Sequence, residues 1–139
     1  MSRTAVLIGY GGMGKRYHQA LKLMKIKTIA ICEKKIKKIS KENFAKNVTI
    51  TNDYKKLLKF KADLLCIASN TESRLKILNS FCKEGKIKKI ITEKPLSTSY
   101  TNCLHINKIV KIIRNKRNNR NQNDLFSNDT NNNIVELNI

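Results

Sequence analysis

Near its N-terminus the chain has an apolar strand, a glycine-rich turn and an amphipathic helix, in that order. Residues 5–8 read Ala-Val-Leu-Ile, and residues 9–14 read Gly-Tyr-Gly-Gly-Met-Gly. Apolar side chains then recur at the three- and four-residue spacing of a helix as far as Met24. A helix with one apolar face needs a sheet or another helix to cover that face. This arrangement predicts an α/β fold in which the helix lies against the strand.

The glycines at positions 9, 11 and 14 have the spacing of a dinucleotide-binding turn. Gly9 can adopt backbone angles that other residues avoid, Gly11 leaves room for a pyrophosphate, and Gly14 lets the helix approach the strand closely. The N–H groups at the start of the helix would also face the phosphates. The alternative is an ordinary turn that binds nothing. The candidate cofactor-binding residues of this turn are Gly9, Tyr10, Gly11, Gly12, Met13 and Gly14.

A carboxylate follows the next predicted strand, residues 28–32, at the position that contacts the adenosine ribose in dinucleotide-binding folds. This residue, Glu33, would accept hydrogen bonds from both ribose hydroxyls and would repel a 2′-phosphate. The predicted cofactor is therefore NAD. Lys34 and Lys35 could neutralise a phosphate at the same place, so NADP stays open as the alternative.

The rest of the chain continues the alternation of strands and helices. Further strands are predicted at residues 48–50, 63–68 and 88–92. Helices are predicted at residues 34–45, after residues 69–71 as far as Gly85, and from Ser99 onward, with Asp53 capping a short helical segment. Helical crossovers between buried strands indicate a parallel sheet with right-handed connections. We therefore predict a Rossmann-type, doubly wound parallel sheet of about five strands with flanking helices. Ligands of such sheets bind at the carboxyl ends of the strands, where Glu33, Ser69 and Glu93 lie.

The 139 residues suffice for one modest domain. The apolar pattern fades near Asn115, and the sequence that follows is rich in asparagine with few core-forming side chains. The sequence predicts an NAD(P)-binding domain over residues 1–115 and a disordered tail over residues 116–139 with a short apolar end. No strand-like run is expected to take a sixth position in the sheet.

The formal net charge is +19, but the lysines are spread along the chain among isoleucine and asparagine residues. Such a drift in composition does not predict specific nucleic-acid binding, only non-specific adhesion at low salt. The apolar runs are too short for a membrane span and no signal peptide is visible, so we expect a cytoplasmic protein. The four cysteines are scattered without a CxxC pair, and neither a metal site nor a disulfide framework is predicted.

The motif Glu93-Lys94-Pro95 follows the fifth predicted strand. Together with residues 8–14 and Ala20-Leu21, it resembles the Gfo/Idh/MocA family of glucose-fructose oxidoreductases and inositol dehydrogenases, over residues 4–114. The resemblance implies an NAD(P)-dependent oxidoreductase acting on a hydroxyl of a sugar, nucleotide sugar or cyclitol. It implies that Lys94 is catalytic, because the family's lysine lies beside the nicotinamide, orients a substrate hydroxyl and helps in proton transfer. The cofactor-binding residues that it implies are Ser69, Asn70, Thr71, Glu93, Lys94 and Pro95.

The sequence also departs from the family pattern. Tyr17 and Arg74 stand where the family has histidines, and His18 and His105 have no recognisable catalytic partners. No segment corresponds to the family's second α/β domain, so we expect a truncated chain that is not catalytically complete alone. The alternative is a stand-alone dinucleotide-binding regulatory or partner subunit. A homo-oligomer or a partner subunit could then complete the cleft.

Overall fold

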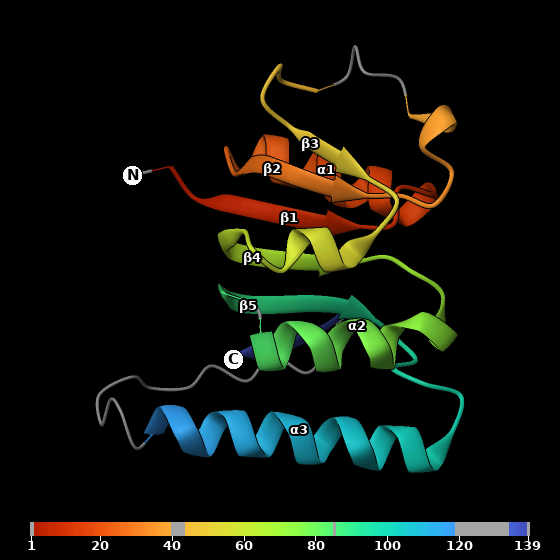
Figure 1. The fold of residues 1–139 in the computed structure, drawn as a ribbon, viewed down its shortest axis with the longest axis vertical. Helices are drawn as coiled ribbons and strands as arrows, with labels where there is room; N and C mark the ends of the chain where they lie inside the picture. Colours follow the sequence, from red (N-terminus) through yellow and green to blue (C-terminus); the bar gives the residue numbers. More distant parts are fainter. Residues whose placement is uncertain (1, 40–43, 85, 119–133, 139) are drawn as a thin grey trace.

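The computed structural model describes residues 2–39, 44–84, 86–118 and 134–138. Within these ranges six strands form one sheet with the order β3-β2-β1-β4-β5-β6 (Figure 1). The strands are β1 (Thr4–Ile8), β2 (Lys27–Cys32), β3 (Thr49–Thr51), β4 (Lys61–Ile67), β5 (Lys86–Glu93) and β6 (Ile134–Asn138). The first five are parallel to one another. The predicted Rossmann-type sheet of five parallel strands is therefore confirmed.

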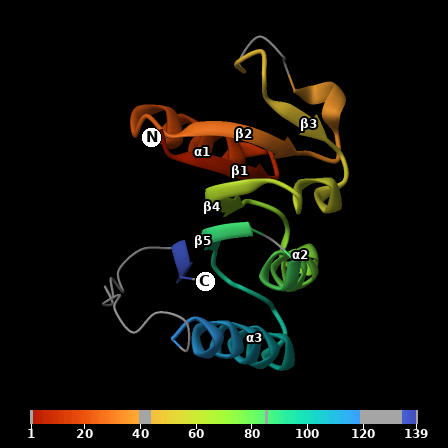
Figure 2. The ribbon, with the colours of Figure 1, turned by 60° about the vertical axis from the view of Figure 1, so that its left-hand side comes forward.

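Helices cover both faces of this sheet. Helix α1 (Gly12–Leu23) lies on one face, α2 (Thr71–Glu84) lies on the other, and α3 (Tyr100–Asn118) packs beside α2 (Figures 1 and 2). Side chains alternate along β1, so that Leu7 packs with Leu21 of α1 while Val6 packs in the cluster that contains Phe81 of α2. Burial on both faces explains why β1 reads as a continuous apolar run.

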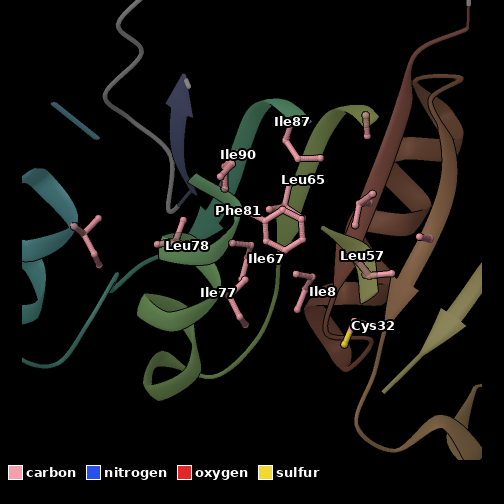
Figure 3. Packing of buried hydrophobic residues seen from close by; sticks show 14 residues of the cluster. Ile8, Cys32, Leu57, Leu65, Ile67, Ile77, Leu78, Phe81, Ile87 and Ile90 are labelled. Carbon is pink, nitrogen blue, oxygen red and sulfur yellow. The ribbon is translucent and has the colours of Figure 1, made fainter. Parts of the chain in front are cut away.

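The larger core cluster lies between α2 and the sheet. Figure 3 shows the Phe81 ring beside Leu65 and Ile67 of β4, with Ile90 of β5 next to them. The Phe81 side chain is only 1% exposed, and the three aliphatic side chains are fully buried. This cluster fixes α2 on the sheet, and it thereby fixes the position of the first turn of α2 at the carboxyl ends of the strands.

Two short 3₁₀ helices, η1 (Ile36–Lys38) and η3 (Tyr54–Leu57), flank β3. Asp53 caps η3 as predicted, because its carboxylate accepts a hydrogen bond from the backbone N–H of Lys55. The amphipathic helix predicted over residues 34–45 is wrong where the structure describes that segment. Only η1 forms there, since the many lysines leave few apolar side chains to hold a longer helix on the sheet.

The C-terminal part of the chain departs from the prediction at the outer side of β5. Helix α3 ends at Asn118. Strand β6 pairs antiparallel with β5, with Ile91 opposite Glu136, so the expectation that no strand takes the sixth position is wrong. The outer edge of β5 offers unpaired N–H and C=O groups, and the β-branched Ile134 and Val135 favour an extended backbone there. The middle of the predicted tail, residues 119–133, lies outside the described residues.

Asp63 links three strands at the edge of the sheet opposite the carboxyl ends. Its carboxylate accepts hydrogen bonds from the backbone N–H of Thr4 at 2.9 Å and from the Lys88 ammonium at 2.6 Å. The Lys88 hydrogen bond, followed by that of Thr4, lowers the pKa of Asp63 from 3.8 to about 2. A lowered pKa in the folded state means that the ionised carboxylate stabilises the fold above pH 3.8 and loses this effect as the pH falls toward 2.

We therefore expect Asp63→Asn to lower the thermal midpoint at neutral pH and to remove part of the acid dependence. The difference between the wild-type and variant midpoints should shrink steadily as the pH falls from about 4 to about 2, because protonation takes the same charge from the wild type. Circular dichroism melts across this range measure the difference. The variant Lys88→Met, which removes the partner, should show the same trend. A difference that does not change with pH would contradict the assignment.

Candidate functional site

A cavity of about 590 Å³ opens at the carboxyl ends of the parallel strands, where the arrowheads of Figure 1 point. This volume lies within the range of about 300–1,000 Å³ that is typical of ligand pockets. The cavity is lined by residues from the turns after β1, β2, β3 and β4 and from α2. These residues are Ile8, Gly9, Gly11, Cys32, Glu33, Lys34, Asn52, Tyr54, Ala68, Ser69, Asn70, Glu72, Ser73, Lys76 and Ile77.

Each of the three glycines of the turn after β1 is a glycine for a different structural reason. Gly9 has φ = 87°, and a Cβ atom there would lie 2.6 Å from the carbonyl oxygen of Ala68. A Cβ atom at Gly14 would overlap the carbonyl oxygen of Gly9. At Gly11, which lines the cavity, a Cβ atom would have no such neighbour within 4 Å. Gly9 and Gly14 thus serve the fold, and Gly11 keeps open space over the turn.

Glu33 lies directly after β2 and holds the glycine turn. Its Oε2 atom accepts a 2.7 Å hydrogen bond from the backbone N–H of Tyr10, and its Oε1 atom accepts one of 3.0 Å from the N–H of Lys35. Each carboxylate oxygen can accept a further hydrogen bond. The carboxylate is therefore oriented by the backbone on one side, and it borders the cavity on the other.

The turn after β4 leads into α2 with a side-chain cap. The Oδ1 atom of Asn70 accepts a 3.3 Å hydrogen bond from the backbone N–H of Ser73, and Thr71 is the first helical residue. Ser69 and Asn70 line the cavity, whereas Thr71 does not. This turn forms the wall opposite Glu33.

The turn after β5 lies outside the lining of the cavity. Lys94 is exposed, and the peptide bond between Lys94 and Pro95 is cis. The side chain of Glu93 forms an ion pair with Arg74 of α2 at 3.3 Å, so its carboxylate is directed toward that guanidinium. In the sequence, Arg74 stands out only as a departure from the family pattern. The contacts of Arg74 with this turn are seen only in the structure.

The remaining predicted residues of the first turn also lie outside the cavity lining. The hydroxyl of Tyr10 is 2.9 Å from Nδ1 of the buried His18, whose ring stacks on Phe44 at 4.9 Å. Met13 accepts a 3.8 Å contact at its sulfur from the guanidinium of Arg16. These side chains support the turn from its outer side. Burial is the main cause that lowers the pKa of His18, and the positive charge of Lys22 lowers it further.

Tyr17 of α1 carries a buried hydroxyl group. Burial raises its pKa to about 12, and the charge of Glu93 adds to the effect. This hydroxyl has no hydrogen-bond partner among the residues that the structure describes. The group is a neutral phenol at physiological pH.

Sequence reasoning missed part of the cavity wall. Asn52 and Tyr54 follow β3, and Ser73, Lys76 and Ile77 come from the first turns of α2. The position of Asn52 after a predicted strand indicated the first of these, since all parallel strands end at the same edge. The spacing of Ser73, Lys76 and Ile77 along a helix indicated the others, but only the packing of α2 shows which face meets the cavity.

Other kinds of site find no support in the described ranges. No group of three or more His, Cys, Asp or Glu side chains there could hold a metal ion. Burial raises the pKa of the Cys66 thiol to about 12 and that of Cys32 to about 11, so neither is a reactive thiolate at physiological pH. No helix in the described part of the chain is both long and apolar enough to span a membrane.

Residues 3–118 match the sequence family described as an oxidoreductase family with an NAD-binding Rossmann fold, Gfo/Idh/MocA. The chain belongs to this family. The resemblance inferred from the turn at residues 8–14 and from Glu93-Lys94-Pro95 is thus confirmed, as is an NAD-binding fold. No curated protein is similar enough to this Gfo/Idh/MocA chain to count as a relative.

Solved structures share the fold of this Gfo/Idh/MocA chain. Myo-inositol 2-dehydrogenase from Lactobacillus plantarum has 21% identity and a TM-score of 0.71, over 83% of this chain and 34% of its own. An oxidoreductase from Agrobacterium radiobacter, in complex with NAD⁺, L-tartaric acid and magnesium, has 19% identity and a TM-score of 0.71, over 82% and 34%. The WlbA dehydrogenase from Bordetella pertussis, in complex with NADH and UDP-GlcNAcA, has 16% identity and a TM-score of 0.69, over 82% and 35%. The chain spans about one third of the length of these structures.

Proposed function

We propose that this chain binds NAD(H) in the cytoplasm as the cofactor-binding part of an oxidoreductase that acts on a hydroxyl of a sugar, nucleotide sugar or cyclitol. The single observation that carries the proposal is the cavity between Gly11 and Glu33, which offers open space over a helix N-terminus beside an oriented carboxylate. Four free cysteines suit a reducing compartment.

The cofactor would lie across the carboxyl ends of β2, β1 and β4. The adenosine ribose would donate hydrogen bonds to Glu33, the pyrophosphate would occupy the space at Gly11, and the N–H groups at the start of α1 would face it. The cavity wall formed by Tyr54 and Ile77 would then enclose the adenine. The other half of the molecule would extend past Ser69 toward β5, where the nicotinamide would lie near Lys94.

The bound cofactor would supply the hydride chemistry, and this chain would supply orientation and proton handling. Lys94 would hold the substrate hydroxyl and take part in moving its proton, as the family resemblance implies. The inositol dehydrogenase and the UDP-GlcNAcA complex among the similar structures support a polyol or nucleotide sugar as substrate. The alternative role is a regulatory or partner subunit that binds the dinucleotide, with a second copy or another subunit completing the cleft.

Calorimetric titration of the purified chain with NADH and, separately, with NADPH tests the proposal. Moderate salt suppresses non-specific adhesion to a protein of net charge +19. Saturable binding with a preference for NADH is the expected result. Absence of saturable binding of either dinucleotide would contradict the proposal. Assay of the same sample with polyols and NAD distinguishes an active enzyme part from a subunit that only binds.

Glu33→Ala should weaken NADH binding about ten- to hundredfold, because hydrogen bonds to a charged acceptor contribute about 1.5–3 kcal/mol. The same change should narrow the preference over NADPH, since the carboxylate no longer repels a 2′-phosphate while Lys34 and Lys35 remain. Glu33→Gln is the matched control, because it removes the charge but keeps an acceptor oxygen for the backbone of Tyr10. An unchanged affinity of Glu33→Ala for NADH would contradict the assignment of Glu33 as the residue that binds the ribose.

A further inference from the structure

Arg74 is a charged side chain buried where the turns after β4 and β5 come together. It belongs to the first turns of α2, and the residue is only 5% exposed. A guanidinium with so little contact with water needs several acceptors, because burying an unpaired charge is costly. The acceptors that it uses reveal its role.

The guanidinium binds both turns at once. Its Nε atom donates to the carbonyl oxygen of Ser69 at 3.0 Å. Its Nη1 atom donates to the carbonyl oxygens of Glu93, at 3.0 Å, and Pro95. Its Nη2 atom donates to the Glu93 carboxylate at 3.3 Å. One rigid, planar group therefore sets the position of the turn after β5 relative to the turn after β4.

These contacts enclose Lys94 without touching its side chain. The carbonyl groups on both sides of Lys94, those of Glu93 and Pro95, are held by the same Nη1 atom, whereas the Lys94 side chain is exposed. Ser69, at the other end of the contact, lines the cofactor cavity. We propose that Arg74 is a positioning residue that sets the location of Lys94 relative to the cofactor, an inference that rests on the proposed function.

The two turns depend on Arg74 to different degrees. The turn at Ser69 and Asn70 is also held by the side-chain cap of α2, through the hydrogen bond between Asn70 and Ser73. The turn after β5 is tied to α2 through the guanidinium. Loss of the Arg74 guanidinium should therefore displace the turn that carries Lys94 more than the adenosine-binding side of the cavity.

Arg74→Lys tests this, because a lysine keeps the charge but lacks the planar fork that reaches several acceptors at once. Calorimetry measures the affinities of NADH and of ADP-ribose, which lacks the nicotinamide, and fluorescence measures the emission of bound NADH. We expect NADH to bind about tenfold more weakly and ADP-ribose to change by less than about twofold. We also expect the emission of bound NADH to move toward that of free NADH. Arg3→Lys, an exposed arginine before β1, is the matched control.

The outcomes separate the two proposals. A wild-type chain that binds neither ligand contradicts the proposed function, and the role of Arg74 falls with it. A wild-type chain that binds both, with an Arg74→Lys variant that loses neither or loses both equally, overturns the positioning role alone. If thermal melts show that Arg74→Lys is unfolded, Glu93→Gln decides the question. This variant removes the negative charge that contacts Nη2 of Arg74, and it should weaken the binding of NADH more than that of ADP-ribose. Equal effects on the binding of the two ligands would contradict the inference.

Discussion

We expect Gly11→Val to abolish NADH binding while the domain stays folded. An added Cβ atom at Gly11 meets no neighbouring group within 4 Å, so the protein itself can accommodate a side chain there. Gly11 lines the cavity, however, so the side chain would occupy the space that the pyrophosphate needs. The backbone there is extended, with φ = −76° and ψ = −158°, so no positive φ at this position requires a glycine. Loss of a favourable residue at this N-cap costs only about 0.5–1 kcal/mol. Calorimetry should show an affinity lower by more than about a hundredfold.

Gly12→Val is the control for this result. Gly12 also has open space around an added Cβ atom, but it does not line the cavity. It introduces the same side chain one residue later, so its effect on NADH should be clearly smaller. Equal losses in the two variants, or full binding by Gly11→Val, would show that the pyrophosphate does not lie over Gly11. Melts of both variants establish that the domain is folded.

Gly14→Ala should strongly destabilise this domain. The added Cβ atom would overlap the carbonyl oxygen of Gly9, which is backbone and cannot rotate away. That backbone is itself fixed, because the N–H of Gly9 donates to the carbonyl of Cys32 at 2.8 Å. Helix α1 would have to move off the sheet. We expect a loss of about 3 kcal/mol or more, a large share of a typical stability of about 5–15 kcal/mol.

Urea denaturation followed by circular dichroism measures this loss. Gly12→Ala is the matched variant, since it adds the same methyl group two residues earlier in the same helix, where no neighbour lies within 4 Å. Its stability should equal or slightly exceed that of the wild type, because alanine favours a helix. A Gly14→Ala domain with an unchanged urea midpoint would contradict the tight helix–strand approach.

The parts of the fold that depend on local sequence patterns could be predicted from the sequence. The glycine turn, the apolar strands and the capping by Asp53 depend on residues close together in the chain, and the structure agrees with them. The segment at residues 34–45 misled the prediction, because a lysine-rich stretch shows helical spacing without enough apolar surface to hold a helix on the sheet. The strand at residues 134–138 has little local signal, since its pairing depends on the edge of β5.

The site was predictable to a similar degree. Gly11, Glu33 and Ser69 follow strands, and their meeting at one edge follows from a parallel sheet. The contacts of Arg74 could not be foreseen, because they join α2 to residues 93–95, which are distant in sequence, and because an arginine there reads as an ordinary polar residue. Which side of α2 faces the cavity likewise depends on how Phe81 packs on the sheet.

The position of β6 has a consequence for synthesis on the ribosome. Strands β1 to β5 precede residues 134–138 in the chain, so β5 is the outer strand of the parallel sheet until β6 pairs with it. Lys86, Lys88 and Lys89 are exposed along that strand. Charged side chains on an edge strand oppose pairing with the edge of another chain. We therefore expect the lysines of β5 to oppose edge-to-edge association of the chain while β6 is unpaired.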